Sequence, residues 1–140
     1  MEPIAVLTPM LTMIGFTLVV IVSLGVTRNI AVLSGRVRIK VFATFSEPGE
    51  PEGMIALRRN VANLFEVPTL FYALCLTAYA TGTVDPTTVT LAWVFVASRV
   101  VHTAIHITYN NVLHRFLVFA VGVTIVAVML VRIAAHLPMG

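Results

Sequence analysis

Residues 4–26 read IAVLTPMLTMIGFTLVVIVSLGV, and no charged side chain occurs between Glu2 and Arg28. A hydrocarbon core about 30 Å thick needs about 20 helical residues to span it. The stretch is too long for the apolar part of a signal peptide, and no basic segment precedes it. It therefore predicts a first transmembrane helix.

Three further apolar stretches follow, at about residues 61–80, 89–108 and 116–131. Asp85 and Pro86 give a turn signal between the second and the third. Between the first two stretches, two prolines and two glycines interrupt residues 46–53, where we expect a solvated loop. We predict an all-α fold, an integral membrane four-helix bundle. We expect a single domain over residues 1–140, with helices at about 4–27, 58–81, 88–109 and 113–135.

The composition excludes several classes of protein. The chain is 59% hydrophobic and only 11% charged, whereas a soluble domain is about 45–50% apolar and about 25% charged. These values exclude a soluble enzyme, a disordered chain and a nucleic-acid-binding module, despite the net charge of +3. The single cysteine, Cys75, excludes an internal disulfide framework and a cysteine-based zinc site.

The basic residues predict the orientation of the chain in the membrane. Most of them flank the first loop, Arg115 flanks the third, and Arg132 alone lies on the opposite side. The positive-inside rule places the first and third loops in the cytoplasm and both termini outside. The small size favours a bacterial inner membrane.

Two stripes of polar residues lie within the expected spans. Arg59, Asn63 and Glu66 share one face of the second helix, and Arg99, His102, His106 and Asn110 share a face of the third. Charge at the centre of a membrane helix costs roughly 2.5–3.5 kcal/mol on insertion scales, so it needs a partner or a function. Most of these groups, with Arg38 and Arg115, fall on the cytoplasmic side. Such a cationic cluster suits an anion that carries carboxylates.

Structural explanations for the same residues stay open. Arg59 and Glu66 would form a structural pair, and Arg99 would bind a neighbouring carbonyl. His102 and His106 have the spacing of a helical metal pair, but no suitable third ligand is evident, so we expect no metal.

Three motifs resemble the MAPEG superfamily, the membrane-associated proteins of eicosanoid and glutathione metabolism. The quoted segments are Gly35-Arg36-Val37-Arg38, Arg59-Asn60-Val61-Ala62-Asn63-Leu64-Phe65-Glu66-Val67-Pro68 and Arg99-Val100-Val101-His102-Thr103, with Arg115 following. The resemblance covers essentially the whole chain and lies closest to the branch of microsomal glutathione transferases and prostaglandin E synthases, with a size typical of prokaryotic members. It departs at Ala62, His106 and Phe116, which argues against an eicosanoid synthase.

The resemblance implies a homotrimer that binds glutathione between subunits near the cytoplasmic face. Arg115 would be catalytic and stabilise the thiolate. The implied glutathione contacts are Arg38, Asn63, Glu66 and His102, with Arg59 ordering the site and His106 donating a hydrogen bond to the peptide.

The expected function is that of a glutathione transferase or peroxidase whose lipophilic second substrate arrives through the bilayer. A non-catalytic membrane scaffold or binding protein of the same family is the alternative. A small transporter fits less well, because its polar residues would line a path to both faces, whereas here they crowd one leaflet.

Overall fold

The computed structural model describes residues 2–44 and 49–137. Its elements, in chain order, are the 3-10 helix η1 (Pro3–Val6) and the helices α1 (Leu7–Leu33), α2 (Val41–Thr44), α3 (Glu52–Thr81), α4 (Pro86–Ile107) and α5 (Val112–His136). The part of the chain that the structure describes contains no β-strand. Four helices are long and apolar enough to cross a membrane, which confirms the predicted all-α class with four spans.

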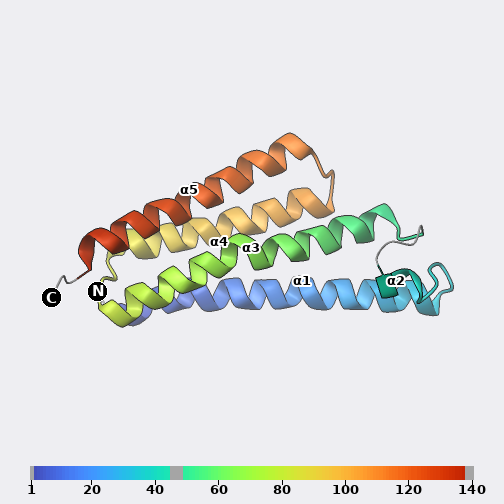
Figure 1. The fold of residues 1–140 in the computed structure, drawn as a ribbon, viewed down its shortest axis with the longest axis horizontal. Coiled ribbons are helices and arrows are strands. Elements are labelled where there is room, and N and C mark those ends of the chain that lie inside the picture. The colour runs from blue at the N-terminus through green and yellow to red at the C-terminus, as the bar shows by residue number, and fades with distance from the viewer. Residues whose placement is uncertain (1, 45–48, 138–140) are drawn as a thin grey trace.

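The four long helices run side by side as an elongated bundle (Figure 1). α3 and α4 each contact α1, whereas α5 packs on α4 and α3 and makes no contact with α1 among the described residues. Both ends of the chain lie at one end of the bundle with the α3–α4 turn. The end of α1, the start of α3 and the α4–α5 turn lie at the opposite end (Figure 1). This arrangement brings the sequence around Arg38, Arg59, His106 and Arg115 to one end of the molecule.

The boundaries of the α3–α4 turn follow from its residues. Gly82 adopts the left-handed conformation (φ 69°) after α3, and the next N–H, of Thr83, donates to the carbonyl of Ala78 (3.0 Å). This is the pattern of a glycine-terminated helix, in which orphan carbonyls of the last turn are satisfied. Asp85 then caps α4 by accepting a hydrogen bond from the N–H of Thr88 (2.7 Å), and Pro86 occupies the first helical position.

The first loop is shorter than its composition indicates. Residues 46–48 of the expected loop lie outside the described residues, and Glu52 and Gly53 already belong to α3, so the loop prediction is wrong for these two. Pro51 precedes the first turn with φ −59°, where a proline fits because the first N–H groups of a helix have no intrahelical partner. The acidic Glu52 in the first turn also suits the positive end of the helix dipole.

Glu50 ties this loop to two helices. Its Oε1 lies 3.5 Å from Nη2 of Arg28 on α1, and its Oε2 lies 3.1 Å from Nη2 of Arg58 on α3. Only 6% of the Glu50 side chain is exposed, so the carboxylate is largely shielded from water. The ion pairs fix the start of α3 against the end of α1.

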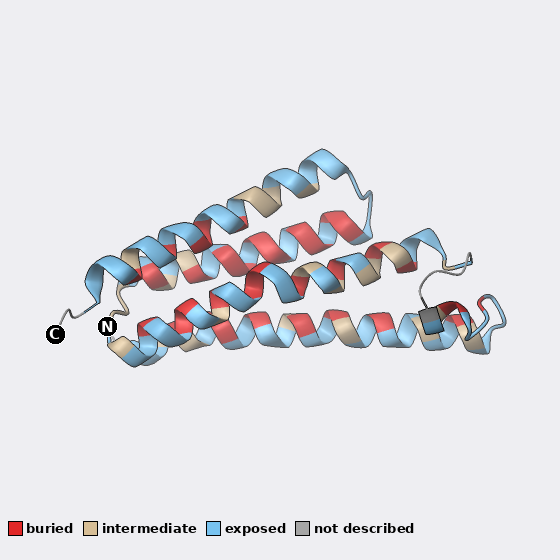
Figure 2. Cartoon of the chain, in the orientation of Figure 1, coloured by how far each residue is buried: buried red, intermediate tan, exposed pale blue. Residues whose placement is uncertain are grey.

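The core of the bundle is apolar and lies between the four helices. Phe71 of α3 stacks on Phe95 of α4 with ring centroids 4.4 Å apart, and Met13 and Met129 are fully buried beside them. Large apolar side chains also cover the outward faces, where Figure 2 shows exposed residues along every long helix. An apolar outside is expected where the surroundings are lipid, because lipid chains solvate such side chains.

Arg99 lies buried within this apolar bundle. Its Nη2 donates to the carbonyl of Val118 on α5 (3.0 Å), and its guanidinium packs 5.4 Å from the Phe95 ring and 5.6 Å from the Phe119 ring. Gly122 makes room for it, because a Cβ at that position would collide with the guanidinium. Arg99 therefore fastens α4 to α5, as expected if it binds a neighbouring carbonyl.

Candidate functional site

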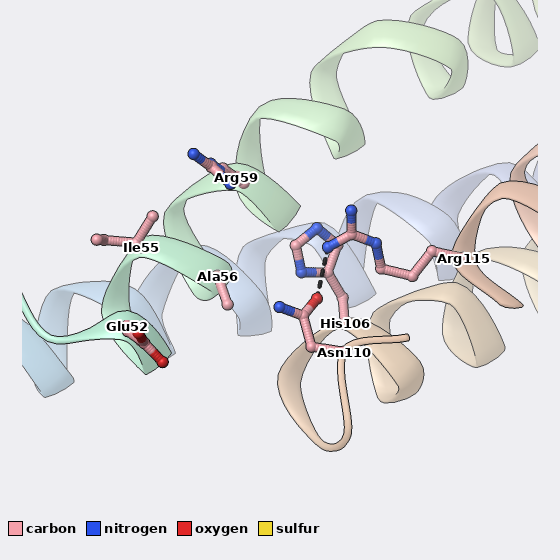
Figure 3. Close-up of a pocket in the computed structure, with 7 residues that line it drawn as sticks. All are labelled: Glu52, Ile55, Ala56, Arg59, His106, Asn110 and Arg115. Carbon is pink, nitrogen blue, oxygen red and sulfur yellow. Dashed lines mark hydrogen bonds between the residues drawn. The ribbon is translucent and has the colours of Figure 1, made fainter. Parts of the chain in front are cut away.

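A cavity of about 270 Å³ opens at the end of the bundle where α3 begins and α4 meets α5. Its walls are formed by Glu52, Ile55, Ala56, Arg59, His106, Asn110 and Arg115 (Figure 3). Two arginines, one acid, one histidine and one amide therefore line a small volume. This polarity contrasts with the apolar surface around it and suits an anionic, hydrogen-bonding ligand.

The α4–α5 turn places Arg115 in this cavity. Asn110 has a positive φ of 50°, a conformation that asparagine tolerates better than most residues, and its N–H donates to the carbonyl of Ile105 (2.8 Å). Asn111 then caps α5 by accepting from the N–H of His114 (3.0 Å). The turn brings the side chain of Asn110 to Arg115, whose Nη1 donates to Oδ1 of Asn110. Arg115 is thus oriented by a residue of the α4–α5 turn.

His106 lines the same cavity as Arg115. Figure 3 shows its ring beside the Arg115 guanidinium, and the residue is only 2% exposed. Its Nδ1 is buried and has no hydrogen-bond partner among the described residues. His102, one turn earlier on α4, is also buried and meets His106 edge to face with ring centroids 5.7 Å apart. The two buried histidine rings therefore lie next to each other along α4.

The side of the cavity formed by α3 is more exposed to solvent than the side formed by α4. Ala56 is buried and faces the cavity, whereas Arg59 is exposed and extends away from Arg115 in Figure 3. Glu52, in the first turn of α3, is exposed as well. The guanidinium of Arg59 is therefore accessible to a ligand from outside the subunit.

A second cavity of about 230 Å³ also has Arg115 in its wall. It is lined by His102, Val112, Arg115, Phe116 and Phe119. Two phenyl rings and a valine make this space more apolar than the first. Arg115 lies at the boundary, because it lines both cavities.

The predicted site residues are distributed over these features. Arg59, His106 and Arg115 share the first cavity, and His102 lines the second. Neither cavity is lined by Arg38, Asn63 or Glu66. Asn63 is half-buried, and Arg38 and Glu66 are exposed on the outside of the subunit.

The proposed structural pair between Arg59 and Glu66 is absent among the described ion pairs. The two residues lie seven positions apart on α3, about 10 Å along the helix axis. Arg59 lies at the cavity, and Glu66 lies farther into the apolar span with an exposed side chain.

The predicted site residues do not include Glu52 and Asn110, the two remaining polar residues of the cavity. The composition of residues 46–53 predicts a loop that includes Glu52, although a proline followed by an acid is a recognised helix-start signal. The helical spacing predicts Asn110 on the polar stripe of the third span, but its bond to Arg115 depends on a backbone turn that the spacing alone does not indicate.

The chain matches the model of a known protein family. Residues 6–135 match the model of the MAPEG family, which covers nearly the whole chain. No curated protein and no solved structure matches the chain.

Proposed function

Because this chain belongs to the MAPEG family, we propose that it is a membrane-bound glutathione transferase or peroxidase. The family includes glutathione transferases and related proteins, and its members generally use glutathione. Glutathione would be a co-substrate, and its thiolate would attack a lipophilic electrophile or hydroperoxide. The four apolar helices make the chain an integral membrane protein, so such a second substrate would arrive from the bilayer.

The position of Arg115 between the two cavities carries this proposal. A thiol with a pKa of about 8.5 is mostly protonated at neutral pH, and only its thiolate is a competent nucleophile. A guanidinium beside the sulfur favours the thiolate, because opposite charges within a few ångströms stabilise each other. With the sulfur under Arg115, the peptide would occupy the polar cavity and the electrophile would occupy the space beside Phe116 and Phe119.

The charges around the polar cavity fit the remaining groups of glutathione, which has two carboxylates and one ammonium. Arg59 would bind a carboxylate in bidentate fashion, and Glu52 would accept from the ammonium. His102, which lines the cavity on the other side of Arg115, would support the thiolate end.

We further propose a homotrimer in which a second subunit completes the site. Glu66 is exposed on the face of α3 that also presents Ala62, Thr69 and Ala73. A carboxylate facing lipid is costly, and small residues allow helices to approach closely in membranes, so this face suits contact with another α3. Arg38 and Asn63 would then reach glutathione bound against a neighbouring subunit.

The first half of α5 supports the same assembly. None of residues 112–121 is buried in the single subunit, which is visible as the pale start of α5 in Figure 2. Arg115 lies in this half, so a neighbouring subunit that covers it would exclude water from the thiolate. We also propose that the chain lies in a bacterial inner membrane, which its small size favours. The basic residues indicate that the site is on the cytoplasmic side and that both termini are outside.

The test is glutathione binding by the purified protein in detergent. We expect wild type to bind glutathione, to show the ultraviolet band of a bound thiolate and to conjugate a generic aryl halide. Arg115→Ala should lose the thiolate band while the oligomer survives, and Lys40→Ala, a change at an exposed cation outside both cavities, should retain it. A wild type that neither binds glutathione nor turns over several electrophiles would instead support the non-catalytic scaffold.

A further inference from the structure

The bundle end that carries the α3–α4 turn contains an ion pair that glutathione chemistry at Arg115 does not use. Arg132, near the end of α5, donates from Nη2 to Oδ2 of Asp85, the residue that caps α4. The two side chains are 32% and 38% exposed, so both can be reached from outside the subunit. Nε of Arg132 is buried and has no hydrogen-bond partner among the described residues, although buried polar atoms are usually paired. The guanidinium therefore has donors that the ion pair leaves unused.

The ion pair connects two hollows of opposite character. The apolar hollow, of about 420 Å³, lies along α5 and is lined by Val123, Thr124, Ala127, Val128, Val131 and Arg132. The polar hollow, of about 390 Å³, is lined by Thr81, Gly82, Thr83, Val84, Asp85 and His136. The hydroxyl of Thr124 donates to the carbonyl of Ala120 (2.9 Å), so it adds no free donor to the apolar hollow. A molecule that spans both hollows must have an apolar part and a polar part that meet at Arg132 and Asp85.

Two aromatic residues indicate that this end of the bundle lies at the membrane surface. Tyr79, near the end of α3, is 44% exposed, and Trp93, two turns into α4, is 43% exposed. Tyrosine and tryptophan concentrate where the hydrocarbon meets the lipid headgroups. The ion pair, beyond both residues at the α3–α4 turn, then lies at the level of the headgroups (Figure 1). The apolar hollow extends from there about 12 Å along α5 into the hydrocarbon, at 1.5 Å per residue.

We propose that the two hollows and the ion pair form a binding site for one phospholipid with an amine headgroup, of which phosphatidylethanolamine is the simplest. Arg132 donates to the phosphate, Asp85 accepts from the ammonium, and one acyl chain lies in the apolar hollow. The site lies at the opposite end of the bundle from Arg115 and does not depend on glutathione binding.

Charge complementarity selects this occupant among the common phospholipids. An ethanolamine headgroup carries a phosphate and an ammonium, which match a guanidinium and a carboxylate one for one. A glycerol headgroup offers no cation to Asp85, and a choline headgroup offers a cation without an N–H donor. Charge-assisted hydrogen bonds are stronger than neutral ones, but exposure of both side chains reduces their effect. We therefore expect a preference of about fivefold to tenfold for the ethanolamine lipid.

The experiment is native mass spectrometry of the delipidated protein in detergent. The protein is titrated with phosphatidylethanolamine, phosphatidylcholine or phosphatidylglycerol, all with the same acyl chains. We expect the wild type to take up one phosphatidylethanolamine per subunit, with at least about fivefold higher affinity than for the other two lipids.

Two substitutions separate the roles of the charges. Arg132→Gln should weaken the binding of all three lipids, because each has a phosphate. Asp85→Asn should bind phosphatidylethanolamine and phosphatidylcholine alike, and it keeps the helix cap because asparagine also accepts from the N–H of Thr88. The matched control is Lys40→Gln, a change at an exposed cation that lines neither hollow, which should keep the wild-type preference.

A third substitution tests the apolar hollow without touching a charge. Ala127 is exposed on α5, so Ala127→Phe fills the hollow from outside and should weaken all three lipids without changing their order. Equal binding of the three lipids by wild type, or an ethanolamine preference that survives Asp85→Asn, would overturn the proposal. A wild-type oligomer that takes up no lipid and that Ala127→Phe splits into monomers would also overturn it, and would assign this face to contact between copies of the chain.

Discussion

Arg115 donates a hydrogen bond from Nη1 to Oδ1 of Asn110, across the turn that joins α4 to α5. Asn110 holds a left-handed backbone conformation, so the acceptor is fixed by the same residue that turns the chain. The bond leaves the rest of the guanidinium facing the two cavities. Arg115 is therefore oriented before a ligand arrives, which favours binding because less freedom is lost.

The first prediction concerns this bond. Asn110→Gly keeps the positive φ accessible and removes only the side-chain acceptor, whereas Asn110→Ala would add backbone strain. Hydrogen bonds to charged groups contribute about 1.5–3 kcal/mol, and this one is exposed, so we expect about a tenfold decrease in bound thiolate at fixed pH. Ultraviolet titration with glutathione measures it. A thiolate yield equal to that of wild type would show that Arg115 needs no such support.

The second prediction concerns the close contact of Gly122 with Arg99. A methyl group at residue 122 would collide with a guanidinium that is held by the Val118 carbonyl and by two phenyl rings. Overpacking of a well-filled core typically costs about 1–3 kcal/mol, so Gly122→Ala should lower the thermal unfolding midpoint in detergent.

The control for this change is Gly25→Ala on α1. Apart from the neighbouring residues and the backbone of its own helix, no heavy atom lies within 4 Å of a Cβ placed there, and alanine is a better helix former than glycine. Gly25→Ala should therefore unfold at the same temperature as wild type or higher. If the two variants unfold alike, Arg99 moves aside without cost and does not fasten α4 to α5.

The third prediction concerns Glu50. Its carboxylate contacts guanidinium groups of both α1 and α3, and its side chain is largely buried. Glu50→Gln keeps the shape but removes the charge, so we expect a loss of about 1.5–3 kcal/mol in the free energy of unfolding. A double-mutant cycle with Arg58→Met isolates the pair, because the two effects should not add. Additive effects would show that Glu50 and Arg58 are independent.

The fourth prediction is a pH dependence at the opposite end of the bundle. Hydrogen bonds from Thr88 and the nearby Arg132 lower the pKa of Asp85 from its usual value of 3.8 to about 2. A carboxyl with a lowered pKa in the folded state stabilises the fold above its unfolded pKa, and this contribution is lost as the pH falls from about 4 to about 2. Asp85→Asn should flatten the stability profile in this window. A profile that matches wild type would show that Asp85 is not coupled to folding.

The sequence predicted the four spans because apolar composition over about 20 residues is a strong and local signal. The sequence predicts a neighbouring carbonyl as the partner of Arg99 but does not identify which one, because the backbone carbonyl of Val118 has no sequence signature. The cavity was partly predictable: Arg59, His106 and Arg115 come from helix ends that topology brings together. The turn at Asn110 was not predictable, because it depends on local backbone conformation rather than on hydrophobic period. The start of α3 at Glu52 was predictable, because an acid that follows a proline is a helix-start signal.

The last prediction tests the proposed assembly through Glu66. This exposed carboxylate lies on the apolar part of α3, where lipid offers it no hydrogen bond. If a second subunit supplies the partner, Glu66→Leu should loosen the oligomer, and native mass spectrometry should show more monomer as detergent is increased. Phe65→Leu, a change at the neighbouring exposed apolar residue, should leave the oligomer intact. Unchanged assembly of Glu66→Leu, together with weaker glutathione binding, would assign Glu66 to the ligand instead of the interface.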